Sequence, residues 1–376
     1  MQKYENNCLF IWACVGECVL LVSLLKSTIF FMDIPSEHTQ NIFPACRVEL
    51  PASAIGKRAA FYLATEEYIA KHLPADNYLF TWKVSNTVVM GRHQHADSEI
   101  NLDFCRANGI DIIRRKSGGG CIFADDNNIM ISLVTGAGAV EPLFKVYAER
   151  VAGALQEIGV NAEVSGRNDI LLDGKKISGN AFYHLSQRNI VHGTLLYSTQ
   201  SDMMSGALCP NPEKMKSHGV KSVKSRVALL KDTLDMNIDQ LETHLIDALT
   251  DRMIRLTEED IQYIKSIEAD YYDPEYLFRK KRQNDVIHTQ YIKGCGEVTL
   301  AFALLDGRVE QVQVEGDYFE ECDANFTFNE AFKDVEFTQH ELERIVEEMQ
   351  PYRCIQGLSR ENLIQILAQA VKKTES

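Results

Sequence analysis

The 376-residue sequence lacks the patterns that mark several common classes of protein. It has no CxxC pair, no Cys/His spacing of the zinc-binding kind and no internal repeat. Its formal net charge of -14 and pI near 5.2 argue against broad nucleic-acid binding, because that activity needs a basic face. The composition is otherwise that of a globular protein, long enough for one large domain or two unequal ones.

The sequence also lacks any clear cysteine framework. Its ten cysteines are scattered along the chain, so we expect free thiols in a reducing cytosol. They are Cys8, Cys14, Cys18, Cys46, Cys105, Cys121, Cys209, Cys295, Cys322 and Cys354.

A long apolar run lies near the N-terminus, at Cys8–Leu25. Its length is at the lower limit for a membrane span, and Glu17 in its middle would be costly there. The residues before it make a poor signal-peptide n-region. Three interpretations compete: a weak membrane anchor, a poor signal peptide, or an extension upstream of a working start near Met32. We favour the extension. We therefore expect residues 1–45 to lie outside the fold.

The rest of the chain alternates between helical and strand-like patterns. Helices are predicted at 59–73, 102–108, 142–158, 238–256, 339–349 and 360–372. Strands are predicted at 78–83, 87–90, 111–115, 121–123, 129–134, 169–172, 175–178, 190–197, and on both sides of residues 306–307. The turn-like Ser85-Asn86 joins the first two strands, and Asp173-Gly174 and Asp306-Gly307 predict tight hairpins. This order predicts a catalytic domain at 46–261, a linker at 262–284 and a small domain at 285–376.

Three glycines follow three cations in RRKSGGGCIF, Arg114–Phe123. Glycine lets the backbone approach a ligand and reach positive φ, and successive N–H groups can then bind an anion. Arg114, Arg115 and Lys116 add positive charge. The spacing is neither a P-loop, because Lys-Ser precedes the glycines, nor GxGxxG. A flexible hairpin with a solvated basic rim is the alternative, and we favour phosphate or carboxylate binding.

The segment SGRNDILLDGKKISGNAFYH, Ser165–His184, adds a hairpin that carries lysines. The compact ammonium of Lys176 suits a phosphoryl oxygen, and Gly179 permits close backbone approach. Asn168 and Asp169 offer oxygens of the kind that Mg²⁺ requires. Taken alone, the segment is explained equally well as an exposed hairpin with a charged tip.

Two further segments have both a structural and a functional interpretation. HGTLLY, His192–Tyr197, is either an ordinary core strand or the wall of a pocket for an apolar tail. NPEKMKSHGVKSVKSRV, Asn211–Val227, is either a solvated basic loop or a mobile loop that closes over a nucleotide. The four segments together suit a ligand with a phosphate end and an apolar end, as an acyl-adenylate has.

These motifs resemble those of the lipoate–protein ligase A family in their order and spacing. GRHQHADSEI, RRKSGGGCIF, SGRNDILL, KKISGNAFY, HGTLLY and NPEKMKSHGVKSVKSRV carry the resemblance from about Phe61 to Val227. The region after about residue 275 resembles the accessory domain of the longer ligases. The resemblance implies an α/β fold (an α+β mixed sheet): a biotin/lipoate ligase-like catalytic domain with a small C-terminal α+β accessory domain.

The resemblance also implies a reaction. The carboxylate of lipoate attacks the α-phosphate of ATP, with Mg²⁺, to give lipoyl-AMP and pyrophosphate, and an acceptor lysine then takes the lipoyl group and releases AMP. The implied acceptors are apo lipoyl domains of 2-oxoacid dehydrogenase acyltransferase subunits and the glycine-cleavage H protein. We expect a cytoplasmic monomer that binds neither nucleic acid nor membrane.

Individual residues of this sequence take roles from the resemblance. Lys176 is implied to be catalytic, because it contacts both the carboxylate and the phosphate. The implied ATP and lipoyl-adenylate site comprises Arg115, Ser117, Gly118, Gly119, Gly120, Cys121, Ile122, Phe123, Lys176, Ser178 and Gly179. The implied lipoate pocket comprises Arg115, Gly119, His192, Gly193 and Thr194. Asn168 and Asp169 match positions near metal and phosphate, and Lys214, Lys221 and Lys224 belong to the loop that closes over the adenylate.

Two other functions stay open. An ATP-independent octanoyl- or lipoyltransferase of the same fold that works through an acyl-enzyme would need a cysteine nucleophile. We interpret Cys121 as a packing residue, and no base is obvious beside Cys209. A non-catalytic lipoate-binding protein would not need Lys176, whose presence favours an enzyme. A biotin ligase shares the architecture, but its glycine-loop signature differs.

Overall fold

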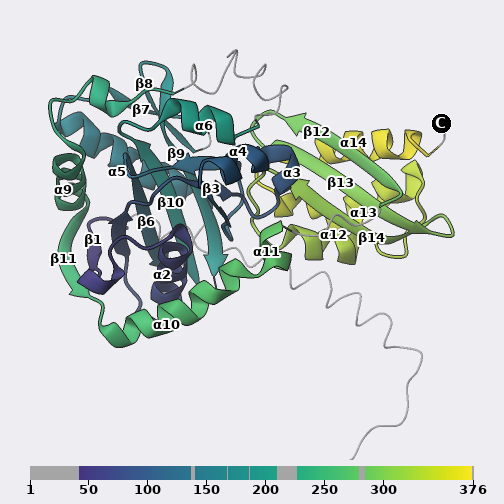
Figure 1. Cartoon of the computed structure of the whole chain (residues 1–376). Coiled ribbons are helices and arrows are strands. Elements are labelled where there is room, and N and C mark those ends of the chain that lie inside the picture. The colour runs from purple at the N-terminus through teal and green to yellow at the C-terminus, as the bar shows by residue number, and fades with distance from the viewer. Residues whose placement is uncertain are drawn as a thin grey trace, which may run out of the picture. The chain divides into compact units, whose positions relative to one another are not determined.

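The computed structural model describes residues 42–136, 140–166, 168–185, 187–209, 227–278 and 284–374 (Figure 1). The apolar run Cys8–Leu25 and the predicted closing-loop lysines Lys214, Lys221 and Lys224 lie outside these residues. Within the described ranges, no helix has both the length and the apolar character needed to cross a membrane.

A mixed sheet of eight strands forms the larger part of the fold (Figure 1). Its strands, in spatial order, are β11 (Thr250–Arg255), β1 (Ala45–Glu49), β2 (Tyr78–Trp82), β6 (Asn128–Gly136), β10 (Arg188–Leu196), β9 (Lys175–Leu185), β8 (Asp169–Leu172) and β7 (Ala162–Ser165). β1 runs parallel to both β11 and β2, and the remaining neighbours are antiparallel. The strands predicted around Asp173-Gly174 form the β8–β9 hairpin, and both turn residues have positive φ, as a tight primed turn requires.

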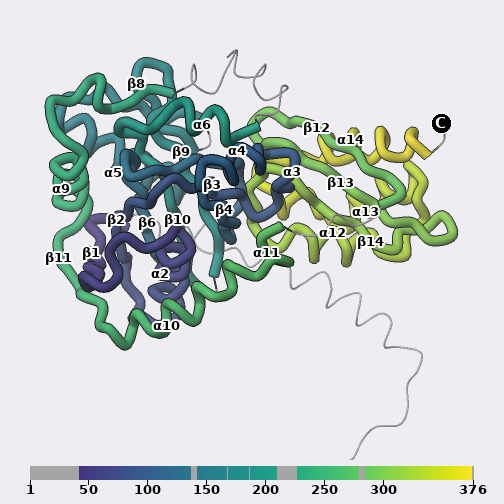
Figure 2. Tube along the Cα trace, viewed as in Figure 1, coloured from purple at the N-terminus to yellow at the C-terminus, as the bar shows by residue number. Residues whose placement is uncertain are grey.

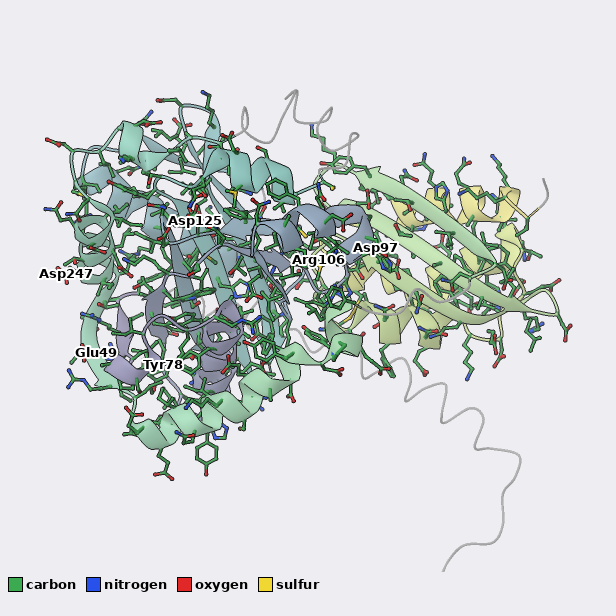
Figure 3. All side chains as sticks on the ribbon, in the orientation of Figure 1. Glu49, Tyr78, Asp97, Arg106, Asp125 and Asp247 are labelled. Carbon is green, nitrogen blue, oxygen red and sulfur yellow. A yellow bond between two sulfur atoms is a disulfide. The ribbon has the colours of Figure 1, made fainter. Side chains whose placement is uncertain are left out.

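Helices cover both faces of this sheet, and the alternation of side chains along β6 explains why. Ile129, Ile131 and Leu133 join a core cluster with α5 (Val140–Glu157) and α9 (Ile238–Leu249). Met130 and Val134 point to the other face, into a cluster with α2 (Ala59–His72) and α10 (Glu258–Glu268). α2 and α10 lie side by side (Figure 2), and side chains fill the space between sheet and helices (Figure 3).

A second, three-stranded sheet carries the glycine-rich segment. Its order is β4 (Asp111–Arg114), β3 (Thr87–Met90) and β5 (Ile122–Ala124). The short helices α3 (Ala96–Glu99), α4 (Leu102–Ala107) and α6 (Ser201–Ala207) pack against it. The two strands that Ser85-Asn86 joins therefore enter different sheets and do not pair with each other.

The C-terminal part is an antiparallel sheet with helices on it. Its strands are β12 (Val286–Ile292), β13 (Gly296–Leu305) and β14 (Arg308–Gly316), and its helices are α12 (Ala324–Phe332), α13 (Gln339–Met349) and α14 (Arg360–Lys372). The predicted turn at Asp306-Gly307 joins β13 to β14. These elements share one apolar core, so this part has the predicted α+β character.

Short helices complete the description. They are α11 (Pro274–Phe278) and the single 3₁₀ turns η2 (Ala52–Ala54), η3 (Leu230–Asp232), η4 (Ala269–Tyr272) and η5 (Pro351–Cys354).

Three expectations from the sequence need revision. The helix predicted at 238–256 ends at Leu249, and residues 250–255 form β11 because this segment completes the edge of the sheet beside β1. Most of the predicted linker, 262–284, is helical and packed, since Ile264 and Tyr271 are buried against α2. The cysteines are not all free, because Cys322 and Cys354 form a disulfide. The domain boundaries themselves stay a prediction.

Candidate active site

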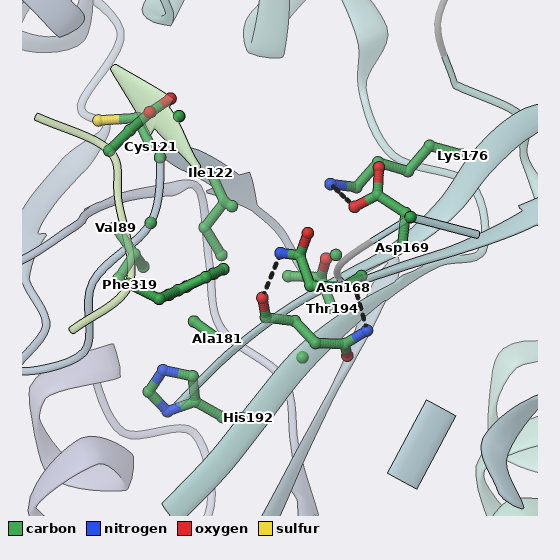
Figure 4. Close-up of a pocket in the computed structure, with 18 of the residues that line it drawn as sticks. Val89, Cys121, Ile122, Asn168, Asp169, Lys176, Ala181, His192, Thr194 and Phe319 are labelled. Atoms are coloured by element: carbon green, nitrogen blue, oxygen red, sulfur yellow. Dashed lines mark hydrogen bonds and ion pairs between the residues drawn. The ribbon is translucent and has the colours of Figure 1, made fainter. Parts of the chain in front are cut away.

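A cavity of about 800 Å³ brings together segments that are far apart in the sequence. It is lined by the glycine loop (residues 115–121), the β8–β9 hairpin, the middle of β10 and two segments of the C-terminal part that include Lys293 and Phe319. Figure 4 shows the Lys176–Asp169 pair at one side of this cavity and His192 at another, with the ring of Phe319 between Val89 and Ala181.

Arg115 shapes the glycine loop from within. Its Nη2 donates to the carbonyl oxygens of Gly118 and Gly120 at 2.7 and 2.8 Å, and its Nη1 donates to Val89 O at 3.0 Å. Its Nε donates to Ser117 Oγ at 2.9 Å. Burial lowers the pKa of Arg115 to about 10, which leaves it charged at neutral pH. Arg115 therefore holds the loop in shape as well as lining the cavity.

The other two cations of RRKSGGG also bind the protein itself. Arg114 is fully buried, and its Nη1 donates to the carbonyls of Gly91, Arg92 and Gln94. The ammonium of Lys116 lies 2.7 Å from Glu67 Oε1. From the sequence we expect the charges of Arg114 and Lys116 to face a ligand. In the structure they instead bind protein groups and hold the backbone around the glycines in place.

The glycine loop also contacts the C-terminal part. Gly119 has a φ of +83°, and its N–H donates to the carbonyl of Tyr318 at 3.0 Å. A Cβ at Gly119 would lie 2.7 Å from the ring of Phe319, so only glycine fits this approach. Phe319 is 1% exposed and packs against Phe144 and Phe182 of the larger part, with ring centroids 5.6 and 5.8 Å away.

The β8–β9 hairpin presents Lys176 to the cavity. Its Nζ lies 2.7 Å from Asp169 Oδ1 on the neighbouring strand (Figure 4). The ammonium rests over Gly179, where a Cβ would lie 2.5 Å from Nζ. The amides of Asn168 and Asn180 each donate to the other's backbone carbonyl, at 2.6 and 2.8 Å, and fix the adjoining strands.

Asn168 and Asp169 provide a modest donor set for a metal ion. One carboxylate and one amide oxygen suit Mg²⁺, which keeps several waters and reaches proteins together with substrate phosphates. Within the described ranges, no cluster of three or more His, Cys, Asp or Glu side chains could hold a metal on its own. The residues thus fit an ion that arrives on a nucleotide.

Part of the cavity lining is apolar. Leu63, Val89, Ile122, Met130 and Ala181 contribute to it, and the ring of His192 lines the same cavity. A Cβ at Gly193 would lie 1.9 Å from Asn180 Oδ1, so any other residue beside that histidine would displace the Asn180 amide.

His192 belongs to a buried polar cluster that includes one residue missed in the sequence. Its Nδ1 lies 2.9 Å from Glu66 Oε2, and its Nε2 lies 2.7 Å from Ser117 Oγ. Glu66 has no exposed surface. A signal for it existed in the sequence, because the adjacent carboxylates Glu66 and Glu67 interrupt the mostly apolar run from Ala59 to Ala70. The structure shows that all of residues 59–70 are buried.

The structure gathers most of the predicted site residues around the one cavity. Those that line it are Arg115, Gly119, Gly120, Cys121, Ile122, Asn168, Asp169, Lys176, Gly179, His192, Gly193 and Thr194. Four others lie just behind its wall. Ser117 bonds His192, Gly118 packs against Tyr318 O, Phe123 lies in the core of the small sheet, and Ser178 bonds Asn180.

Comparison with known proteins identifies the family. The family model of the lipoyl protein ligase A/B catalytic domain matches residues 58–250, and that of the bacterial lipoate protein ligase C-terminus matches residues 283–367. Lipoate–protein ligase 1 of Staphylococcus aureus is 30% identical over 81% of this chain and 95% of its own length. The lipoate-protein ligase LplJ of Bacillus subtilis is 34% identical over 68% of this chain and 81% of its own length.

Solved structures agree with the predicted fold. P. falciparum LipL1 in complex with lipoate covers 87% of this chain and 99% of its own, with a TM-score of 0.70 at 15% identity. A bipartite ligase from Thermoplasma acidophilum, described with its E2 lipoyl domain, covers 64% and 99% with a TM-score of 0.56 at 25% identity. Lipoate-protein ligase A bound with ATP covers 62% and 98% with a TM-score of 0.55 at 24% identity. The chain therefore belongs to the lipoate–protein ligase family, and it is an enzyme of the ligase class.

Proposed function

We propose that this enzyme activates lipoate with ATP to form lipoyl-AMP and then transfers the lipoyl group to a lysine of an acceptor lipoyl domain. The observation that carries the proposal is the cavity itself. It joins a lysine and a glycine loop, which suit phosphates, to an apolar wall, which suits the hydrocarbon chain of lipoate.

Lys176 is the residue we assign to the chemistry. In the first step a lipoate carboxylate oxygen attacks the α-phosphorus, the α–β phosphoanhydride bond breaks, and pyrophosphate leaves. Both reactants are anionic, so an ammonium held between them lowers the repulsion and stabilises the charge that develops. Asp169 and Gly179 fix where that ammonium lies.

The second step uses the same charge. The neutral amine of an acceptor lysine attacks the acyl carbonyl, the bond from the carbonyl carbon to AMP breaks, and AMP leaves with the electron pair. An amide forms, and the amine's extra proton passes to solvent. Lys176 then faces the departing phosphate, which its positive charge stabilises.

Mg²⁺ would be held by Asp169 and Asn168 and would neutralise charge on the nucleotide phosphates. Arg115 keeps the loop carbonyls turned toward itself, so the peptide planes of the loop are fixed before the nucleotide binds. This preorganisation increases the reaction rate, because the loop need not reorganise during the reaction.

Two related structures support the substrates we assign. One relative is described with its E2 lipoyl domain, and another is bound with ATP. We infer that the acceptors here are lipoyl domains of 2-oxoacid dehydrogenase acyltransferase subunits and the glycine-cleavage H protein.

A second candidate function is ATP-independent acyl transfer through an acyl-enzyme. One observation favours it: Cys121 lines the cavity and is half-buried, so it is not only a packing residue. A thiol there could take an acyl group from an acyl carrier. Cys121→Ser abolishes transfer on this route and leaves the ATP-dependent route active.

Lipoate-dependent exchange between ATP and pyrophosphate tests the main proposal. We expect exchange in the parent and its loss in Lys176→Ala. Lys145→Ala, which removes an exposed lysine on α5, is the matched control and retains exchange. A parent that transfers octanoate from a carrier protein but shows no exchange would replace the proposal with the second candidate.

A further inference from the structure

A continuous chain of buried hydrogen bonds connects α2 to the glycine loop. It runs from Arg115 Nε to Ser117 Oγ at 2.9 Å, and from there to His192 Nε2 at 2.7 Å. It ends where His192 Nδ1 meets Glu66 Oε2 at 2.9 Å. The four residues come from three separate segments of the sequence, so the chain is a product of the tertiary fold.

With His192 neutral, the chemistry of the end groups fixes the direction of every bond in this chain. A guanidinium only donates, so Ser117 Oγ accepts from Arg115 and directs its own proton to His192 Nε2. His192 then carries its proton on Nδ1 and donates it to Glu66. An ionised carboxylate only accepts, so the chain closes there without a conflict.

A second donor chain reaches the same carboxylate. The indole Nε1 of Trp82 donates to Ser132 Oγ at 2.9 Å, and the Ser132 hydroxyl donates to Glu66 Oε1 at 2.6 Å. Both oxygens of Glu66 therefore accept hydrogen bonds inside the protein, which makes its charge tolerable at this depth.

Arg115 and Glu66 are opposite charges at the two ends of the longer chain. Arg115 is 4% exposed and Glu66 is fully buried. The four oxygens to which Arg115 donates belong to a hydroxyl and three peptide groups, and none of them carries a charge. A buried charge without a counter-charge is strongly destabilising, so the attraction of Glu66 through the intervening dipoles matters to Arg115.

The Ser117–His192–Glu66 connectivity is that of a hydrolytic triad, but the geometry argues against hydrolysis. Ser117 has no exposed surface and does not line the cavity, so its oxygen cannot reach a substrate carbonyl. One lone pair of that oxygen is already bound by Arg115. The cluster therefore orients other groups instead of attacking a substrate.

The groups it orients are peptide planes of the glycine loop. Arg115 Nη2 holds the carbonyls of Gly118 and Gly120. Because each peptide unit is planar and trans, fixing these carbonyls also fixes the N–H group of Gly119, which donates to the carbonyl of Tyr318, and that of Cys121. Gly119 and Cys121 line the cavity where the adenylate would bind.

We propose that Glu66 is a positioning residue for the activation step: as the counter-charge of Arg115, connected to it through His192 and Ser117, it holds the glycine loop in the conformation that binds the nucleotide. This inference rests on the proposed function only because its kinetic test measures ATP-dependent activity. The tautomer of His192 is a consequence that can be measured without activity.

The kinetic test compares Glu66→Gln with Asp125→Asn. Glutamine keeps the size and one acceptor of Glu66 but removes the charge. We expect the KM for ATP in lipoate-dependent pyrophosphate exchange to rise at least about tenfold in Glu66→Gln, the usual effect of losing a charged hydrogen bond. Asp125 is the matched control, because it is also a fully buried carboxylate, and its partners do not line the cavity: the N–H groups of Asn127 and Gln200 and the hydroxyl of Thr199. Its variant loses stability and keeps the KM for ATP.

A double variant separates positioning from simple destabilisation. Ser117→Ala cuts the chain, so adding Glu66→Gln to it should raise the KM for ATP little further. Independent structural roles would instead multiply the two effects. Equal KM values for Glu66→Gln and the parent, or multiplied effects in the double variant, overturn the inference.

The tautomer test uses ¹⁵N NMR of histidine-labelled protein. We expect the parent to show His192 protonated on Nδ1, and Glu66→Gln to lose that preference. A parent in which Nε2 carries the proton overturns the inference whether or not the enzyme is active. Absence of exchange in the parent, with His192 protonated on Nδ1, sinks the proposed function and leaves the hydrogen-bond chain intact.

Discussion

The ammonium of Lys176 lies 2.7 Å from Asp169 Oδ1 and fills the space that a Cβ at Gly179 would need. The carboxylate of Asp169 attracts the Lys176 ammonium toward the neighbouring strand of the hairpin. Gly179, which has no side chain, leaves room for the lysine side chain to lie there. Together they aim a flexible side chain at one point of the cavity before any substrate arrives, and this lowers the entropy lost in the reaction.

Removing the carboxylate of Asp169 tests whether it positions the Lys176 ammonium. Asp169→Asn keeps the shape and the strand pairing but weakens the hold on Lys176. We expect kcat for lipoate-dependent pyrophosphate exchange to fall by about 100-fold, the loss typical of a misplaced catalytic group. Steady-state exchange kinetics measure it, with far-ultraviolet circular dichroism to check the fold. An unchanged kcat would mean that the substrates, and not Asp169, position the lysine.

Adding a single methyl group at Gly179 tests the same geometry from the other side. A Cβ there would lie 2.5 Å from Nζ, so Gly179→Ala should displace the ammonium and lower kcat while the protein stays folded. Gly153→Ala on α5 is the matched control, since its Cβ meets nothing within 4 Å. That control should raise the free energy of unfolding by about 0.5–1 kcal/mol, because alanine is the better helix former. Equal kinetics in the two variants would show that Lys176 tolerates side chains beneath it.

Glu320 makes the stability of the fold depend on pH. Burial alone would raise its pKa, but the hydrogen bond and charge of His93, 2.9 Å away, and the charge of Arg92 outweigh burial and hold the pKa below the ordinary 4.5. A lowered folded-state pKa stabilises the fold above the unfolded-state value, and this stability is lost as the pH falls through the folded-state pKa.

We therefore expect Glu320→Gln to lower the free energy of urea unfolding at pH 7. The difference from the parent should shrink as the pH falls below about 4.5, where Glu320 of the unfolded chain binds a proton before Glu320 of the folded protein does. Glu330→Gln, which removes an exposed carboxylate of α12, controls for net charge. A difference that stays constant with pH would contradict this account of Glu320.

The Cys322–Cys354 disulfide predicts a dependence on reductant. It closes a loop with a sequence separation of 32, and bonds of this kind typically contribute about 2–4 kcal/mol. Differential alkylation with mass spectrometry should find these two cysteines protected until reductant is added, whereas Cys209, which is exposed, reacts at once. Immediate labelling of Cys322 would support the free thiols expected from composition.

Local signals in the sequence predicted some of these elements well. The Asp173-Gly174 and Asp306-Gly307 turns were predicted because turn chemistry is local, and helices α13 and α14 because their apolar residues repeat at helical spacing. β11 was missed because its pairing with β1 brings together residues about two hundred positions apart, which no local pattern records.

The site residues also fall into those that local motifs predict and those that only the structure shows. Lys176, Gly179 and His192 lie in recognisable motifs, and the structure brings them to one cavity. The sequence showed the charge of Arg115 but not its partners, so its part in holding the loop carbonyls emerged only in three dimensions. Glu66 and Phe319 were missed because each reaches the site from an element that carries no motif of its own.

The most direct test of the central claim is lipoate-dependent ATP–pyrophosphate exchange, measured in the parent, Lys176→Ala and Lys145→Ala at equal folded concentration. The account predicts exchange that requires lipoate, is lost in Lys176→Ala and persists in Lys145→Ala. Exchange that survives in Lys176→Ala, or a folded parent that shows none, would contradict it.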